Sequence, residues 1–283
     1  MLKMPSMRAH GVRTLGGRDV PEVLRVLDAD PVAACMIAAR VEEIGLDARL
    51  LHGQLWARGA TKSSLCFSGA NLVPLSGGPD DVRAFADRAA RLPRVCSSLV
   101  GRAELTLPLW EELQADWGPP REVRAEQPLL AVTHVPDHLI DRDVRQVRPH
   151  EINAYFPVAV AMFREEVGVD PLAGDGGVGY RRRIANLIDA GRAYARFDGE
   201  RVIFKAEVGS MSRAVGQIQG VWVAPDLRSH GLGTGGTAAV AAMVNAGGRI
   251  ASLYVNSFNT PARRAYARIG FRRVGTFTTV LLD

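Results

Sequence analysis

A glycine-rich segment near the C-terminus has the clearest chemical potential in this sequence. Arg228, Gly231 and Gly233 form an Arg-x-x-Gly-x-Gly pattern between a predicted strand and a predicted helix. Glycine lets the backbone adopt positive φ angles and approach a ligand closely. A helix N-terminus presents unpaired N–H groups and a partial positive charge. The pattern therefore predicts a site for a phosphate or pyrophosphate.

Two further glycines, Gly235 and Gly236, fall in the first turn of the predicted helix. Each costs about 1 kcal/mol in helix propensity relative to alanine. Close approach to a pyrophosphate would explain them, and a turn that merely packs tightly is the alternative. The turn dipeptide Asp198-Gly199 predicts a β-hairpin between strands at 193–197 and 202–208. A dinucleotide site of the Rossmann type fits poorly, because the strand before the glycine loop follows this hairpin instead of opening a βαβ unit.

A second motif follows the glycine loop. A β-branched strand at 250–255 leads to Asn259. A helix at 261–269, with Thr260 as its predicted N-cap, carries Tyr266 before Gly270-Phe271. The two motifs together resemble the GNAT N-acyltransferases, in particular their glycine N-acyltransferase-like branch, over about residues 144–283. Residues 163–168 and 220–223 also resemble an actinobacterial two-domain subgroup with an uncharacterised N-terminal domain.

The resemblance implies an acyl-CoA donor, normally acetyl-CoA, and no metal. The backbone of Val221 and Val223, on either side of Trp222, would pair with the pantetheine arm. Asn259 would reach the cofactor, although stabilising a turn before the helix is the alternative. Tyr266 would donate a proton to the leaving CoA thiolate, whereas helical spacing alone favours a core tyrosine. The pyrophosphate would be held by Arg228, Ser229, His230, Gly231, Leu232, Gly233 and Thr234.

The general base is harder to assign. An acceptor amine must lose a proton to become a nucleophile, which requires a base or a water relay. Many relatives carry a glutamate where this chain has Gln217. Glu207 on the neighbouring hairpin strand and Glu165 or Glu166 at the end of a helix are the candidates. For each of them, a surface ion pair with an arginine is the alternative.

Composition restricts the class of protein. The 283 residues are 47% hydrophobic and 23% charged, with a net charge of +5, as expected of a soluble globular protein. We find no apolar run of membrane-spanning length, no signal-peptide pattern and no basic run typical of nucleic-acid binding. The three cysteines, at unrelated spacings, favour neither disulfides nor a zinc site and suggest a cytoplasmic protein. Lysine is rare, so 32 of the 35 basic residues are arginine, for which codon bias is the simplest explanation.

The chain divides into two halves around a proline-rich connection. We predict an N-terminal domain at 1–133, a linker at 134–143 and a catalytic domain at 144–283. The fold class is α+β: a GNAT fold in the second half, with a mixed, mostly antiparallel sheet flanked by helices. The weaker signals of the first half follow a similar order and predict a degenerate GNAT-like domain.

The first half lacks the phosphate pattern. After the candidate strand at 71–75, it has Ser76-Gly77-Gly78-Pro79-Asp80-Asp81. The two aspartates suit a helix start but would repel a pyrophosphate. We therefore expect that this domain has lost acyl-CoA binding and shapes an acceptor cleft or an oligomer interface.

These observations predict an acetyl-CoA-dependent N-acetyltransferase. An amine of a small molecule, amino acid or peptide would attack the thioester of acetyl-CoA directly. A non-catalytic acyl-CoA sensor or scaffold is the alternative, which Gln217 favours. The expected ligands are acyl-CoA and an amine acceptor, with no nucleic-acid or membrane partner and a homodimer as the candidate assembly. Arg181, Arg182 and Arg183 are read as a solvated helix face, or as contacts to a CoA phosphate or an acidic acceptor.

Overall fold

The computed structural model describes residues 11–59 and 63–283. Their contacts divide into two units, one reaching Leu129 and also holding Val274–Asp283, the other spanning Leu130–Arg273. This division differs from the predicted domains at the C-terminus, because the final strand packs with the first unit. Among the helices of the described residues, none is long and apolar enough to cross a membrane.

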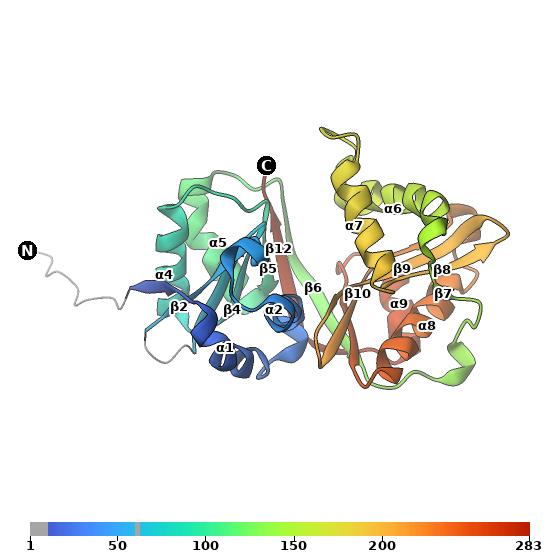
Figure 1. The fold of residues 1–283 in the computed structure, drawn as a ribbon, viewed down its shortest axis with the longest axis horizontal. Helices are drawn as coiled ribbons and strands as arrows, with labels where there is room; N and C mark the ends of the chain where they lie inside the picture. The colour runs from blue at the N-terminus through green and yellow to red at the C-terminus, as the bar shows by residue number, and fades with distance from the viewer. Residues whose placement is uncertain (1–10, 60–62) are drawn as a thin grey trace, which may run out of the picture. The chain divides into compact units, whose positions relative to one another are not determined.

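The first unit is a mixed sheet covered by helices (Figure 1). Its strands lie in the order β1, β2, β3, β4, β5, β12, β6. The first four form an antiparallel series, β5 runs parallel to β4, and β12 runs antiparallel to β5. The bounds are β1 Val12–Thr14, β2 Gly53–Arg58, β3 Leu65–Gly69, β4 Asn71–Ser76, β5 Ser98–Arg102, β6 Glu122–Val132, β12 Arg272–Leu281, α1 Val20–Leu27, α2 Pro31–Ile44, α3 Ala48–Leu51, α4 Pro79–Ala90 and α5 Ala103–Trp117.

Apolar periodicity fixes how these helices pack. The residues of α4 that are buried, Val82, Phe85, Ala86 and Ala89, recur at the spacing of one helix face. They join a core that includes Trp56, Leu99 and Leu109 and also Cys66 and Cys96. Cys35, Cys66 and Cys96 are all free and buried, and burial raises the pKa of the Cys66 thiol.

Along the chain, the second unit follows the same order of elements as the first: a strand, a group of helices, three strands, a helix, a strand and a helix (Figure 1). Strands β7 to β10 form an antiparallel series, and β11 runs parallel to β10. The predicted hairpin around Asp198-Gly199 is present, with Gly199 at φ +58°. The bounds are β7 Arg145–Gln146, β8 Ala193–Asp198, β9 Arg201–Met211, β10 Val215–Val223, β11 Ile250–Tyr254, α6 Ile152–Val167, α7 Val178–Asp189, α8 Leu232–Ala246 and α9 Thr260–Ile269.

The strand β9 separates two packing environments because successive side chains point to opposite faces. Phe204, Ala206 and Val208 join the core that contains the apolar residues of α8 and α9. Lys205 and Glu207 alternate with them and are therefore directed to the other face, where Tyr155 of α6 contacts Lys205. This second face is the unusual one, because it buries charged side chains.

Candidate active site

The strands β10 and β11 diverge in the middle of the second unit. They pair in parallel only at three rungs, from Val215–Ile250 to Gln217–Ser252. Beyond them β10 continues to Val223 while paired with β9 alone. Residues 218–223 of β10 thus have an edge with no paired strand among the described residues. Ser252 lies at the rung where the strands part, and its buried hydroxyl has no hydrogen-bond partner in that part of the chain.

The glycine loop follows directly from this edge. A 3₁₀ turn at Pro225–Leu227 leads to Ser229, whose φ of +68° is unusual for a residue with a side chain. Gly231 has φ +88° and precedes α8, and a Cβ added there would meet nothing within 4 Å. The first helical hydrogen bond is donated by Gly235 to Gly231 at 2.9 Å. The N–H groups of Leu232, Gly233 and Thr234 therefore have no acceptor in the described residues. These three N–H groups could bind an anion, as the sequence pattern predicts.

The next two glycines have a different explanation from the expected one. A Cβ on Gly236 would lie 2.5 Å from the Phe204 ring, and one on Gly235 would lie 3.1 Å from the Asp141 Cβ. These positions need glycine because α8 packs closely on its own unit. Tight packing, which the sequence left as the alternative to pyrophosphate approach, is sufficient to explain them.

Arg228 is engaged in this structure. Its Nη2 lies 2.7 Å from Glu165 Oε2, and its Nε donates to the Val223 carbonyl at 3.2 Å. Glu165 also accepts a hydrogen bond of 3.2 Å from the Trp222 indole. The carboxylate of Glu165 therefore ties the end of α6 to the glycine loop. The structure places Glu165 beside the loop, but as the half-exposed ion-pair partner of Arg228.

Asn259 begins the helix α9. Its side-chain oxygen accepts a hydrogen bond from the Ala262 N–H at 3.2 Å, which is the role of an N-cap. The predicted cap, Thr260, is instead the first residue of the helix, so the cap lies one residue earlier than predicted. The side-chain amide nitrogen of Asn259 takes no part in this cap.

Tyr266 lies on the buried face of α9. Its ring packs against Phe271 with centroids 5.8 Å apart, and the residue is 7% exposed. Its hydroxyl has no hydrogen-bond partner in the described residues. Burial, together with the charge of Glu166, raises its pKa, so the hydroxyl stays protonated at neutral pH. The side chain thus combines the packing of a core residue with an unused donor.

Glu207 is buried in an ion pair. Its Oε1 lies 2.6 Å from Lys205 Nζ, and both side chains are almost fully buried. Its Oε2 accepts a hydrogen bond of 3.3 Å from Gln219. Burial alone would raise the pKa of this carboxyl, but the charges of Lys205 and Arg183 and the two hydrogen bonds lower it overall. Glu207 is therefore an anion whose two oxygens are both engaged.

A bulge in β10 lies directly against this ion pair, and the sequence did not reveal it. The pairing of β10 with β9 shifts between Gln219 and Trp222, and Gly220 has φ +57°. A Cβ on Gly220 would lie 3.1 Å from Lys205 Nζ and 3.0 Å from Met162 Cε. The signal available was two charged residues, at positions 205 and 207, on one face of an otherwise apolar strand.

The arginines of α7 serve different purposes. Arg181 donates to Asn153 at 2.6 Å and stacks over Phe156 at 5.2 Å from the ring centroid. Arg183 helps to lower the pKa of Glu207. Tyr180, which packs against Phe163, donates to the Ala159 carbonyl at 3.1 Å. The face is thus only partly the solvated surface that the sequence suggested.

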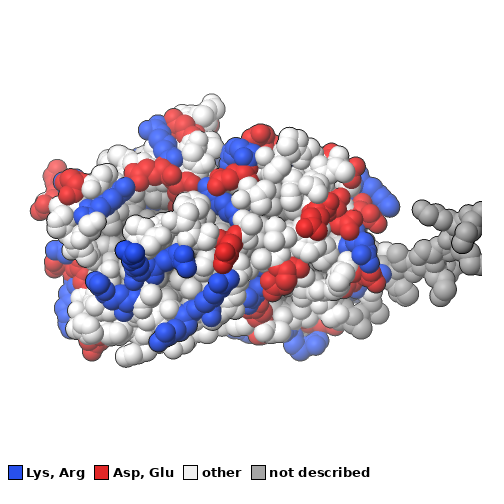
Figure 2. Space-filling model, turned by 180° about the vertical axis from the view of Figure 1, so that it is seen from behind, with Lys and Arg blue, Asp and Glu red and all other residues white. Residues whose placement is uncertain are grey.

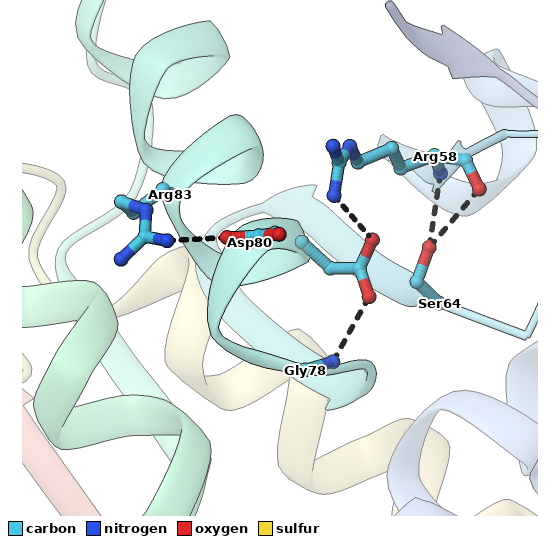
Figure 3. A network of polar contacts seen from close by, with 6 residues as sticks. Arg58, Ser64, Gly78, Asp80 and Arg83 are labelled. Atoms are coloured by element: carbon cyan, nitrogen blue, oxygen red, sulfur yellow. Dashed lines mark hydrogen bonds and ion pairs between the residues drawn. The ribbon is translucent and has the colours of Figure 1, made fainter. Parts of the chain in front are cut away.

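The first unit fills the corresponding loop with its own carboxylates (Figure 3). Asp81 Oδ2 accepts a hydrogen bond of 2.9 Å from the Gly78 N–H at the start of α4. Its other oxygen lies 3.2 Å from Arg58, and Asp80 pairs with Arg83. The positive end of this helix is thereby occupied by side chains of the same unit.

Strand divergence is shared by the two units, whereas the anion site is not. In the first unit β4 and β5 pair in parallel at only two rungs, Asn71–Ser98 and Leu72–Leu99. The second unit has all the groups of the candidate site: the unpaired N–H groups at the start of α8, the half-exposed Arg228, the unpaired hydroxyl of Ser252 and the protonated hydroxyl of Tyr266. Within residues 11–59 and 63–283, no group of three or more His, Cys, Asp or Glu side chains is arranged for a metal ion.

Comparisons with known proteins support the fold. Residues 53–155 match a family described as a domain of unknown function, DUF4081, and residues 204–280 match the family described as FR47-like protein. The second match contains the glycine loop, Asn259 and Tyr266. No curated protein matches the sequence significantly.

Solved structures of similar fold span both units. A Drosophila protein superposes with a TM-score of 0.68 at 14% identity, covering 97% of this chain and 99% of the other. An acetyltransferase of the GNAT family from Colwellia psychrerythraea gives 0.58 at 10% identity, covering 96% and 99%. A tandem GNAT protein from the clavulanic acid biosynthesis pathway gives 0.50 at 14% identity, covering 95% and 98%. The predicted fold class, α+β with GNAT-like halves, is confirmed.

Proposed function

We propose that this chain, which has the GNAT fold and an FR47-like region, is an N-acetyltransferase. It would transfer an acetyl group from acetyl-CoA to an amine of a small molecule, amino acid or peptide. Within the superfamily, we assign it to the glycine N-acyltransferase-like branch and to a two-domain subgroup. The separation of β10 from β11 beyond Gln217, leading into a loop with three unpaired N–H groups, carries the proposal.

The residues of this region suit a bound acyl-CoA. Acetyl-CoA, when bound, supplies the acetyl group as an activated thioester. The unpaired edge of β10 would hydrogen-bond the pantetheine arm through the backbone of Val221 and Val223. The amides of Leu232, Gly233 and Thr234, with Arg228, would hold the pyrophosphate. Ser229 and His230 shape the loop, because Ser229 adopts a positive φ and the His230 ring contacts the Arg228 carbonyl.

Two residues would act close to the thioester end. Asn259 keeps its amide N–H groups available while its oxygen caps α9. Tyr266 would hold a proton for the departing thiolate, and its raised pKa keeps that proton in place at neutral pH. Ser252 supplies a further unused hydroxyl where the strands part.

The acceptor amine would attack directly and lose its proton to water. Glu165 and Glu207 remain the two carboxylates that could receive it through a relay, but each is already engaged. Gln217 offers no carboxylate. A cysteine-linked intermediate is unsupported in the second unit, because all three cysteines lie in the first.

The first unit would be a degenerate partner domain that does not bind acyl-CoA. Asp81 already occupies the amide at the start of α4, and a second anion there would be repelled. We retain the domain limits 1–133 and 144–283 with a linker at 134–143, but assign the last strand to the partner domain's sheet. A homodimer and a cytoplasmic location are part of the same proposal.

A non-catalytic acyl-CoA sensor is the second candidate function. The engagement of both candidate bases in ion pairs favours it, since neither carboxylate is free to accept a proton. The unused Tyr266 hydroxyl favours catalysis instead.

One experiment separates these functions. Titration calorimetry with acetyl-CoA measures binding, and thiol release across a panel of amines, amino acids and peptides measures turnover. An acetyltransferase binds acetyl-CoA and releases CoA only when an acceptor is present. Binding without acceptor-dependent release would identify a sensor, and no binding at all would refute both functions.

A further inference from the structure

Positive charge is concentrated at the C-terminal end of the sequence. Residues 227–282 contain seven arginines and no aspartate or glutamate. At the chain average of 30 acidic residues in 283, a stretch of this length would hold about six. Codon bias can replace lysine by arginine, but it does not remove acidic residues. The asymmetry therefore calls for a physical explanation.

Most of this charge is exposed on one helix and the strand after it. Arg264 and Arg268 of α9 and Arg272 of β12 are exposed, and none has an ion pair or hydrogen bond to the described residues. We call these three residues the arginine face. Figure 2 shows basic side chains gathered on the back of the second unit, in the left half of the view.

The arginine face is electrostatically unfavourable on its own. Arg264 and Arg268 are four residues apart on a helix, where like charges repel by a few tenths of a kcal/mol. Some exposed arginines elsewhere in the second unit do have acidic partners, as in Arg164–Asp170 and Arg201–Asp226. The absence of such partners around α9 leaves its positive potential uncompensated.

The arginine face belongs to the same unit as the candidate pyrophosphate loop. Helix α9 packs beside α8, whose N-terminus forms that loop. Fields from exposed charges extend over about 10 Å at moderate ionic strength and farther at low salt. At low salt this range exceeds the length of α9, which is about 15 Å for its 10 residues, so an anion approaching the loop would experience the field of the arginine face.

We propose that the arginine face is an electrostatic capture surface for acyl-CoA. This inference rests on the proposed function, because acyl-CoA, with its pyrophosphate and 3′-phosphate, is the polyanion that the loop would bind. Exposed ion pairs add little to affinity, whereas a field of one sign can raise association rates by roughly 10-fold or more. The arginine face thus speeds the arrival of the donor more than it slows its departure.

Stopped-flow binding of acetyl-CoA tests this proposal, with tryptophan fluorescence as the signal because Trp222 lies beside the loop. The triple variant R264Q/R268Q/R272Q removes three charges that have no partner. The matched control R18Q/R49Q/R91Q removes three exposed charges from the first unit. Melting temperatures and circular dichroism establish that both variants are folded.

The proposal predicts a several-fold lower association rate for the arginine-face variant at low salt, with its dissociation rate unchanged. The difference disappears at high salt, and the control variant stays within about twofold of the wild type. Equal losses in both variants would show that only net charge matters. Wild-type rates in the arginine-face variant would refute the proposal.

The proposed function can fail separately. If the wild-type protein does not bind acetyl-CoA at any salt concentration, the proposed function itself is refuted. If acetyl-CoA kinetics are unchanged in the arginine-face variant but its retention on heparin is lost, the surface serves a macromolecular polyanion and the inference is overturned.

Discussion

Lys205 Nζ lies 2.6 Å from Glu207 Oε1 in an ion pair that is almost completely shielded from solvent. The same ammonium lies 5.3 Å from the centroid of the Tyr155 ring and close to the backbone of Gly220. The ion pair therefore packs against the bulge of β10 at Gly220. Strand β10 carries the backbone that we expect to face acyl-CoA, so a buried charge pair underlies the proposed binding edge.

Replacing Glu207 by glutamine should destabilise the protein strongly. The change leaves the Lys205 ammonium buried without a counter-ion, at a cost of about 3–5 kcal/mol in the free energy of unfolding. The double variant K205M/E207Q should recover most of that loss because it removes the orphaned charge. Denaturant unfolding measures both, and a stable single variant would contradict the burial of the pair.

The pH dependence of that effect follows from the lowered pKa of Glu207. A carboxyl with a lower pKa in the folded state stabilises that state above its unfolded pKa, which is about 4.3. This contribution is lost as the pH falls through the folded pKa. The difference in unfolding free energy between wild type and Glu207→Gln should therefore be full at pH 6–7 and shrink below about pH 4.

Local signals in the sequence were sufficient for much of the second unit. The Asp198-Gly199 turn located the β8–β9 hairpin, and the Arg228–Gly233 pattern located the start of α8. Both depend on backbone conformations that few residues adopt. The cap of α9 was displaced by one residue because Asn259 and Thr260 are both good N-caps.

Features that depend on distant residues were not predictable in this way. The last strand pairs with β5, and Phe277 lies opposite Arg102, 175 positions away in the chain. Nothing in the local sequence records such a partner. The engagement of Arg228 by Glu165 is similar, because its two members come from different elements. The residues of the candidate site could therefore be predicted from the sequence, but the ion pairs and hydrogen bonds that they form in this structure could not.

Glu165→Gln tests whether that carboxylate is a base or an ion-pair partner. If it only restrains Arg228, its neutralisation should tighten acetyl-CoA binding by about two- to fivefold, the value of an exposed pair, and leave turnover unchanged. Calorimetry and thiol release give the two quantities. Glu166→Gln is the matched control for charge, and a tenfold loss of turnover at unchanged affinity would instead identify Glu165 as the base.

Gly236→Ala should mainly lower stability, whereas Gly231→Ala should mainly weaken acetyl-CoA binding. A methyl group at position 236 would meet the Phe204 ring at 2.5 Å, so we expect a loss of about 1–3 kcal/mol in stability. At position 231 there is space but φ is +88°, so alanine should distort the loop and weaken acetyl-CoA binding. Thermal unfolding and calorimetry on both variants test this, and weaker binding in Gly236→Ala without loss of stability would return that glycine to the pyrophosphate site.

Tyr266→Phe is the most selective test of catalysis. The substitution removes a hydroxyl that has no partner in the described residues and keeps the ring packed against Phe271, so stability should change by less than about 1 kcal/mol. If the hydroxyl protonates the leaving thiolate, turnover should fall by about 10²–10⁴ while acetyl-CoA affinity stays constant. Tyr155→Phe is the matched control, because its hydroxyl donates to the Ala206 carbonyl and its loss should affect stability more than turnover. Equal turnover in wild type and Tyr266→Phe would leave Tyr266 as a core residue, and the departing thiolate would then take its proton from water.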